Sequence, residues 1–214
     1  MLEIRKPIPI GEAVNRIMKF AVKGSTEFVS INESYGRYLS EELVATNHVP
    51  PFDKSPYDGF AVRSIDTKNA ALDNPVEFEV IDHIGAGKVS TKTLGPFQAV
   101  RIMTGAQMPE GSDAVVMLEL AKITDREDKQ YMTIKRSYNK GDNVSFCGED
   151  AKEGEVLVQK GTCINPGIQA MLATFGYAQV PVARKPIVGL FATGTELLNV
   201  EDPLEPGKIR NSNS

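Results

Sequence analysis

Two aspartates stand in a short proline-rich stretch, PPFDKSPYDGFA, over residues 50–61. The stretch ends in Gly59 and apolar residues, which is typical of a turn that enters a strand at Phe60. An aspartate before glycine commonly bonds to nearby backbone, and this is the structural interpretation of Asp58, while Asp53 would shape the turn. The alternative is that one of them presents its carboxylate to a reaction.

Other reactive residue types are sparse and form no familiar catalytic pattern. Cys147 and Cys163 make neither a disulfide framework nor a zinc pattern, and His48 and His83 have no ligand partners nearby in the sequence. No Ser-His-Asp or Cys-His arrangement is evident, so a covalent protein intermediate is not expected. These absences favour a site that works by positioning.

Composition limits the classes of protein and partner. The 214 residues are 41% hydrophobic and 24% charged, enough to form a core in one large or two modest domains. A net charge of −4 argues against binding to nucleic acid or an anionic membrane. No apolar run approaches the roughly 20 residues of a membrane helix, and residues 1–5 lack the apolar centre of a signal peptide. We therefore expect a cytoplasmic protein.

Hydrophobic periodicity predicts helices on both sides of a strand-rich region. The first helix is expected over residues 9–23, closed by Gly24, and the second from Asn32, as N-cap, to about Leu43. A third should begin at Asn165-Pro166 and end at Gly176. Between them, we expect strands at residues 76–81, 99–104, 113–119 and 130–136, and one more at 155–159.

The last thirty residues change character again. The apolar residues 187–191 predict a buried strand, followed by the loop Thr193-Gly194-Thr195 and a helix that begins at Glu196. Such a unit opens an α/β domain, but one strand cannot bury both faces of a sheet. We therefore expect that the third domain is only begun in this chain.

Four segments together resemble a known family. They are PPFDKSPYDGFAVR (50–63), RIMTGAQMPEGSDAVVMLE (101–119), GDNVSFCGEDAKEGEVL (141–157), and ATGTELL with PGKIRNSNS (192–214). Their order and spacing resemble the MoeA family of molybdopterin molybdenumtransferases, whose eukaryotic counterparts are the gephyrin and Cnx1 E domains. The similarity covers the chain as the amino-terminal half of such a protein.

The resemblance implies an elongated α+β fold of several parts. A helical and strand dimerisation region would comprise residues 1–49 and 140–183, with an inserted, mainly β lobe at 50–139 and the truncated start of a MogA-like α/β domain at 184–214. It also implies an enzyme of molybdenum cofactor synthesis, which uses adenylyl-molybdopterin, molybdate and Mg²⁺ and releases AMP. The homodimer's cleft would lie between the third domain of one subunit and the β lobe of the other, and a MogA-like adenylyltransferase would be a possible partner.

The family motifs assign roles to particular positions. The implied catalytic residues are Asp58, Thr104, Asp150 and Glu196, of which Asp58 and Glu196 would bind the metal because Mg²⁺ prefers one or two carboxylates with phosphate oxygens and water. Each has a structural alternative, such as a strand end at Thr104 or an acid at a helix start at Glu196. The implied cofactor-binding residues are Ser55, Gly105, Thr193, Gly194 and Asn213.

The chain departs from the family pattern at two places. Ser145-Phe146-Cys147 stands where many members have arginines before GED, and Thr195 replaces the acid that usually precedes Glu196. Lys54, Arg63 and Arg101 are candidate cations in place of those arginines, although such side chains are usually solvated surface. Two other functions stay open: a non-catalytic dimerising scaffold of the gephyrin type, and a Mg²⁺-dependent phosphohydrolase.

Overall fold

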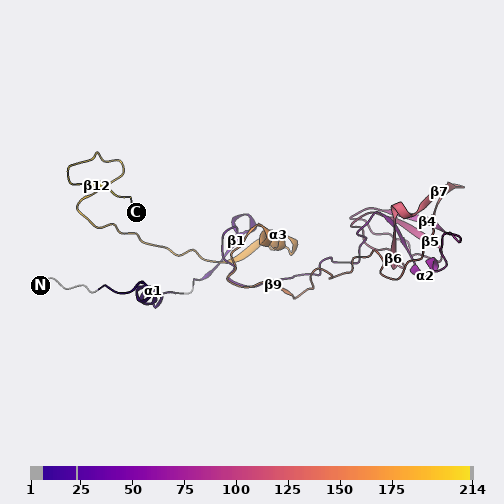
Figure 1. The fold of residues 1–214 in the computed structure, drawn as a ribbon, viewed down its shortest axis with the longest axis horizontal. Helices are drawn as coiled ribbons and strands as arrows, with labels where there is room; N and C mark the ends of the chain where they lie inside the picture. Colours follow the sequence, from indigo (N-terminus) through magenta and orange to yellow (C-terminus); the bar gives the residue numbers. More distant parts are fainter. Residues whose placement is uncertain (1–6, 23, 213–214) are drawn as a thin grey trace.

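The computed structural model describes residues 7–22 and 24–212. The chain is a mixed α/β protein with few helices and many short strands, drawn out along one axis (Figure 1). A six-stranded sheet lies at one end, and a smaller unit with α3 (Pro166–Thr174) lies in the middle. The α+β class and the elongated shape are thus confirmed, whereas the predicted dimerisation region and MogA-like start stay predictions.

The large sheet has the strand order β6-β3-β5-β4-β8-β7, with β4 and β5 parallel and the other neighbours antiparallel. Alternate residues of β3 serve opposite faces: Phe60 packs with one buried cluster and Ala61 with another. Both faces are therefore covered, which explains why β3 is apolar throughout. The strands are β3 (Gly59–Val62), β4 (Val76–Ile84), β5 (Gln98–Ile102), β6 (Ala114–Met117), β7 (Lys122–Arg126) and β8 (Lys129–Ile134), and the short helix α2 (Ser64–Thr67) follows β3.

The four strands predicted in this region are present, with different ends. β4 continues three residues beyond the predicted Ile81, while β5 stops before Thr104, which lies in the turn that follows. A short 3-10 helix, η2 (Leu118–Leu120), takes the place of the predicted end of β6. β7 was not predicted, because its sequence KITDR is polar and the strand lies at an exposed edge of the sheet.

The predicted helix over residues 32–43 is wrong. Only one 3-10 turn forms, η1 (Ile31–Glu33), and its N-cap is Ser30, whose Oγ accepts a hydrogen bond from the Asn32 amide. Gly36 then takes a φ of +71°, and Leu39 donates its N–H to the carbonyl of Thr162 at 3.0 Å. Backbone pairing with a distant segment, which no local pattern reveals, therefore replaces helical bonding here.

The middle unit joins segments from both ends of the sequence. β1 (Thr26–Ser30) pairs antiparallel with β10 (Gln179–Ala183), and β2 (Leu43–Val44) pairs antiparallel with β9 (Val156–Val158), close to the predicted fifth strand. Their shared core is apolar and includes α3 residues. Its buried members are Leu39, Leu43, Ile164, Ile168, Leu172, Val180 and Val182.

The third predicted helix is confirmed together with its cap. The Asn165 side chain accepts a hydrogen bond from the Ile168 amide at 2.9 Å, and Pro166 occupies the first helical position. Asn165→Ala should lower the free energy of unfolding by about 1 kcal/mol, whereas Asn165→Ser should retain most of the stability that the cap contributes. Urea denaturation followed by circular dichroism measures both, and equal midpoints for the alanine variant and the parent would contradict the cap's contribution.

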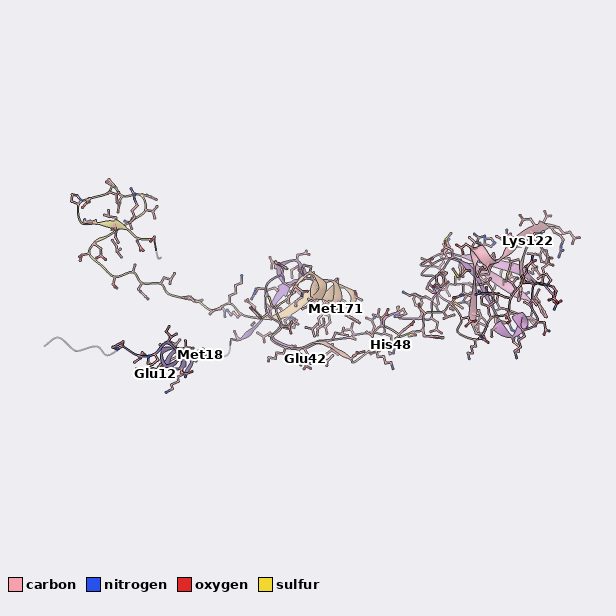
Figure 2. The ribbon with its side chains drawn as sticks, in the orientation of Figure 1. Glu12, Met18, Glu42, His48, Lys122 and Met171 are labelled. Atoms are coloured by element: carbon pink, nitrogen blue, oxygen red, sulfur yellow. The ribbon has the colours of Figure 1, made fainter. Side chains whose placement is uncertain are left out.

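The chain enters and leaves the large sheet through two adjacent segments, which form one narrow connection. Val49 bridges to Ala151, and the backbones of Lys54 and Ser145 exchange two hydrogen bonds of 2.9 Å. Figure 2 shows His48 in this connection, between the middle unit with Met171 and the sheet with Lys122. Two antiparallel segments therefore hold the sheet to the rest of the chain, and the predicted domain boundaries near residues 50 and 140 stay a prediction.

The described residues toward the two ends, 7–22 and 184–212, carry little regular structure. α1 (Ile10–Met18) lies within the first predicted helix but ends well before Gly24, and it stands apart from the sheets (Figure 1). The predicted strand at residues 187–191 is wrong, since Ile187 and Phe191 are exposed and no strand of the described residues pairs with them. The predicted helix at Glu196 is wrong too: a turn there leads into β11 (Leu197–Leu198), which pairs in parallel with β12 (Ile209–Arg210). Within the described ranges, no helix is long and apolar enough to cross a membrane.

Candidate functional site

Asp58 and Thr104 meet at one end of the large sheet. Asp58 comes just before β3 and Thr104 just after β5, and these antiparallel strands pair Gly59 with Ile102. Antiparallel pairing therefore brings together residues that are far apart in the sequence. Oδ1 of Asp58 accepts hydrogen bonds from the Thr104 amide at 2.7 Å and from the Thr104 hydroxyl at 2.8 Å.

These bonds lower the pKa of the carboxyl group. The Thr104 amide and then the Thr104 hydroxyl hold the pKa of Asp58 below its ordinary value. Burial opposes them, and the charge of Arg101 adds a weaker lowering effect. Asp58 is therefore ionised at neutral pH. Within the described residues, its second oxygen, Oδ2, accepts no hydrogen bond, so that oxygen can bind a cation.

Thr104→Val removes the hydroxyl donor and keeps the amide. The pKa of Asp58 should rise toward the ordinary value of 3.8, as measured by a carbon-13 NMR titration of the carboxyl group. Because the native pKa is depressed, the ionised carboxylate stabilises the fold above pH 3.8, and this stability is lost as the pH falls through the native pKa. The variant should lose part of that acid-side stability, and an unchanged titration curve would show that the hydroxyl bond does not form.

Ser55 and Gly105 shape the turn beneath this pair. The Gly105 amide donates to the Ser55 carbonyl at 2.8 Å, and Gly105 has a φ of +84°, a conformation that glycine adopts without strain. Ser55 is fully buried, and its hydroxyl donates to the carbonyl of Tyr57 at 2.5 Å. The structure thus gives the Ser55 side chain a turn-forming contact, while the Gly105 backbone stays beside Thr104.

The two acids near the connection, Asp53 and Asp150, form other contacts. Oδ1 of Asp53 accepts the Cys147 amide at 2.8 Å, so Asp53 ties the proline-rich stretch to the segment before GED. The amide of Asp150 donates to the Val49 carbonyl at 2.9 Å, and its carboxylate is exposed. In the described part of the chain, no hydrogen bond or ion pair joins Asp150 to Asp58.

The predicted residues of the C-terminal segment gather around a separate hollow. A cavity of about 330 Å³ is lined by Thr193, Glu196 and residues 209–212, among others. The Glu196 carboxylate lies so close to Gly194 that a Cβ there would be 2.5 Å from its oxygens. Asn213 lies outside the described residues.

A single chain does not bring the two predicted metal ligands together. Glu196 belongs to the β11–β12 segment, which lies at the opposite end of the molecule from the large sheet (Figure 1). Asp58 directly precedes β3 of that sheet. Among the described residues, no group of three or more His, Cys, Asp or Glu side chains could hold a metal ion. Asp58 alone would fit Mg²⁺ only with ligands from elsewhere, such as phosphate oxygens and water.

The three candidate cations differ in their surroundings. Arg63 pairs with Asp66 at 3.5 Å, and the Lys54 backbone is tied to Gln107 and Ser145. The Arg101 guanidinium lies 5.5 Å from the centroid of the Phe60 ring, on the strand that leads to Thr104. Sequence reasoning named Arg101 but gave no means to separate it from the other two, because that required the strand register.

Comparisons with known proteins agree with the motifs. The family model described as MoeA N-terminal region (domain I and II) matches residues 8–176. The chain is 63% identical, over all 214 residues, to the molybdopterin molybdenumtransferase of Bacillus subtilis, and 53% identical over 212 residues to that of Staphylococcus epidermidis. It spans about half the length, 50%, of each of these relatives.

A solved structure is similar over nearly the whole chain. The crystal structure of the molybdopterin biosynthesis moeA protein from Pyrococcus horikoshii OT3 superposes with a TM-score of 0.86 at 38% identity, covering 98% of this chain and 55% of that one. A second structure of a moeA protein from this organism gives a TM-score of 0.87 at 33% identity, covering 97% of this chain and 52% of that one. With its motifs, its matched region and its fold in agreement, the chain belongs to the MoeA family.

Proposed function

We propose that this chain is the amino-terminal half of a molybdopterin molybdenumtransferase, an enzyme of molybdenum cofactor synthesis. The full protein would insert molybdate into adenylyl-molybdopterin with Mg²⁺ and release AMP. The observation that carries this proposal is the Asp58–Thr104 pair, an exposed carboxylate with one oxygen fixed by two donors and the other open. The molybdopterin molybdenumtransferases of Bacillus subtilis and Staphylococcus epidermidis, 63% and 53% identical to this chain, support the same reaction.

Each residue of the pair has a part in this proposal. Asp58 presents Oδ2 to the cation, and Thr104 lowers the pKa of the carboxylate and fixes its direction. Mg²⁺ bound there would neutralise the pyrophosphate and polarise the adenylyl phosphorus. The Gly105 backbone, which has no Cβ in the way, allows a ligand to approach beside Thr104.

The second half of the site would come from another subunit. Glu196, Thr193 and Gly194 belong to the segment that carries β11 and β12, which lies at the opposite end of the molecule from the large sheet (Figure 1). Asn213 follows this segment in the sequence. In a homodimer, that segment of one subunit could face the large sheet of the other. The proposal thus includes a homodimer, a cytoplasmic location and a possible MogA-like supplier of the adenylylated substrate, with Asp150 as a further acid of the cleft.

The test uses the full-length protein with adenylyl-molybdopterin, molybdate and Mg²⁺. We expect AMP release that depends on molybdate, measured by chromatography. Release without molybdate would favour a Mg²⁺-dependent phosphohydrolase, and no release from a folded dimer would favour a non-catalytic scaffold. Light scattering on the same sample measures the oligomeric state, and a monomer would contradict the shared cleft.

A further inference from the structure

Three side chains form a row across one face of the large sheet. Phe60 of β3 pairs with Arg101 of β5, and Arg101 pairs with His83 of β4. Residues paired in register project to the same face, so the three side chains are neighbours. The Phe60 ring is fully buried, and the Arg101 guanidinium lies 5.5 Å from its centroid. The ring therefore supports a half-buried cation at the end of the sheet.

Arg101 differs from a comparable arginine on the same sheet. The Arg126 guanidinium lies 4.2 Å from the Tyr131 centroid, but it also forms an ion pair of 2.6 Å with Glu77. Within the described part of the chain, Arg101 has no carboxylate within ion-pair distance. Its guanidinium is thus held by an aromatic ring while its hydrogen-bond donors stay available.

The available guanidinium lies on the side of the sheet that carries Asp58. The β3–β6 hydrogen-bond ladder continues past Gly59, because the Asp58 carbonyl accepts a hydrogen bond from the Leu118 amide at 2.9 Å. Asp58 stands two residues before Phe60, so its side chain lies on the same face of the sheet as the Phe60 ring. On the neighbouring strands, exposed Met103 and the small Gly85 follow Arg101 and His83 on this face. A carboxylate and a guanidinium without an ion-pair partner are therefore presented on the same face of the sheet, with the exposed Met103 next to them and no side chain on Gly85.

We infer that Arg101 binds phosphate oxygens of the substrate beside Asp58, making this end of the sheet a two-charge site. Asp58 would supply a carboxylate oxygen to the divalent cation, and Arg101 would bind phosphate oxygens, because the planar, forked donors of arginine suit phosphate. The inference rests on the proposed function, since it names how this chain recognises the pyrophosphate of that substrate. It also supplies a cation that the segment before GED lacks in this sequence.

Inorganic pyrophosphate at a fixed MgCl₂ concentration is the probe, titrated into the full-length protein and followed by calorimetry and by the amide NMR signal of Thr104. Arg101→Gln should weaken binding by about tenfold or more, because hydrogen bonds to a charged group contribute roughly 1.5–3 kcal/mol. Arg101→Lys keeps the positive charge but not the forked pair of donors, so its affinity for pyrophosphate should fall only a few-fold. The matched control is Arg126→Gln, which removes another ring-stacked arginine of the same sheet and should leave the affinity unchanged.

Three results would overturn the inference: equal pyrophosphate affinity in Arg101→Gln and the parent, an equal loss in Arg126→Gln, or no shift of the Thr104 signal in the parent. The amide NMR spectrum shows whether each variant is folded. If Arg101→Gln does not fold, the comparison of pyrophosphate affinity is made with Arg101→Lys. The outcomes are separable from those of the proposed function. If pyrophosphate binding requires Arg101 in a protein that releases no AMP, the proposed enzymatic function is contradicted and the proposed anion site is retained.

Discussion

Gly59→Ala should destabilise the large sheet by about 3 kcal/mol or more, the largest stability effect that we expect from a single methyl group. A Cβ at Gly59 would lie 2.0 Å from the Val116 carbonyl oxygen and 3.1 Å from the Met117 Cα. These are backbone atoms of the paired strand β6, so no side chain can rotate away to make room. The β3–β6 pairing must open, and the site at the start of β3 would be displaced with it.

Urea denaturation and amide hydrogen exchange on β3 measure this loss. Gly85→Ala is the matched control, since a Cβ there meets only the Met103 sulfur at 3.9 Å, an ordinary contact at the same end of the sheet. The free energy of unfolding of the control should stay within about 0.5 kcal/mol of that of the parent. If both variants unfold at the same urea concentration as the parent, the close approach of β3 and β6 is wrong.

Asp58→Asn in the full-length enzyme should reduce molybdenum insertion by about a hundredfold or more, comparable to the loss of one fixed electrostatic group at an active site. The asparagine oxygen can still accept from Thr104, so the turn should persist, and the melting temperature should change little. What is lost is the negative charge and the open oxygen for the cation. AMP release and thermal unfolding, measured on the same preparation, separate the two effects.

Asp53→Asn is the control for this prediction. Asp53 belongs to the same proline-rich stretch, and its carboxylate accepts the Cys147 amide, a bond that asparagine can also accept. The activity of the Asp53→Asn enzyme should therefore stay near that of the parent. Equal activity in Asp58→Asn and Asp53→Asn would remove Asp58 from the catalytic residues and return it to the structural role of a turn aspartate.

The sequence predicted the elements whose signals are local. Asn165-Pro166 marks the start of α3 through its own cap, and the apolar strands of the large sheet stand out against the turns between them. β1 and β10 were not predicted, because each is short and is completed by a partner about 150 residues away. The helix expected from Asn32 failed for the same reason, since Leu39 bonds to Thr162 in place of its own turn.

The candidate site was predictable in its members and not in its geometry. Asp58 and Thr104 came from family motifs, whereas their two hydrogen bonds follow from the β3–β5 register. Periodicity cannot distinguish a guanidinium stacked on Phe60 from one paired with an acid, so Arg101 could not be ranked above Arg63. At the C-terminal end, an apolar run predicted a strand, yet a strand needs a neighbour, and Ile187 has none among the described residues.

The narrow connection also bears on the order in which the chain folds. β1 and β10 are joined by a long loop, and closing such a loop before its contacts form costs conformational entropy. Once the large sheet has folded, Lys54 and Ser145 are held side by side, and the loop between β1 and β10 is shortened to less than half. Halving a loop lowers its closure cost by about 0.6 kcal/mol. The sheet that carries Asp58 should therefore fold first and act as the template on which the middle unit closes.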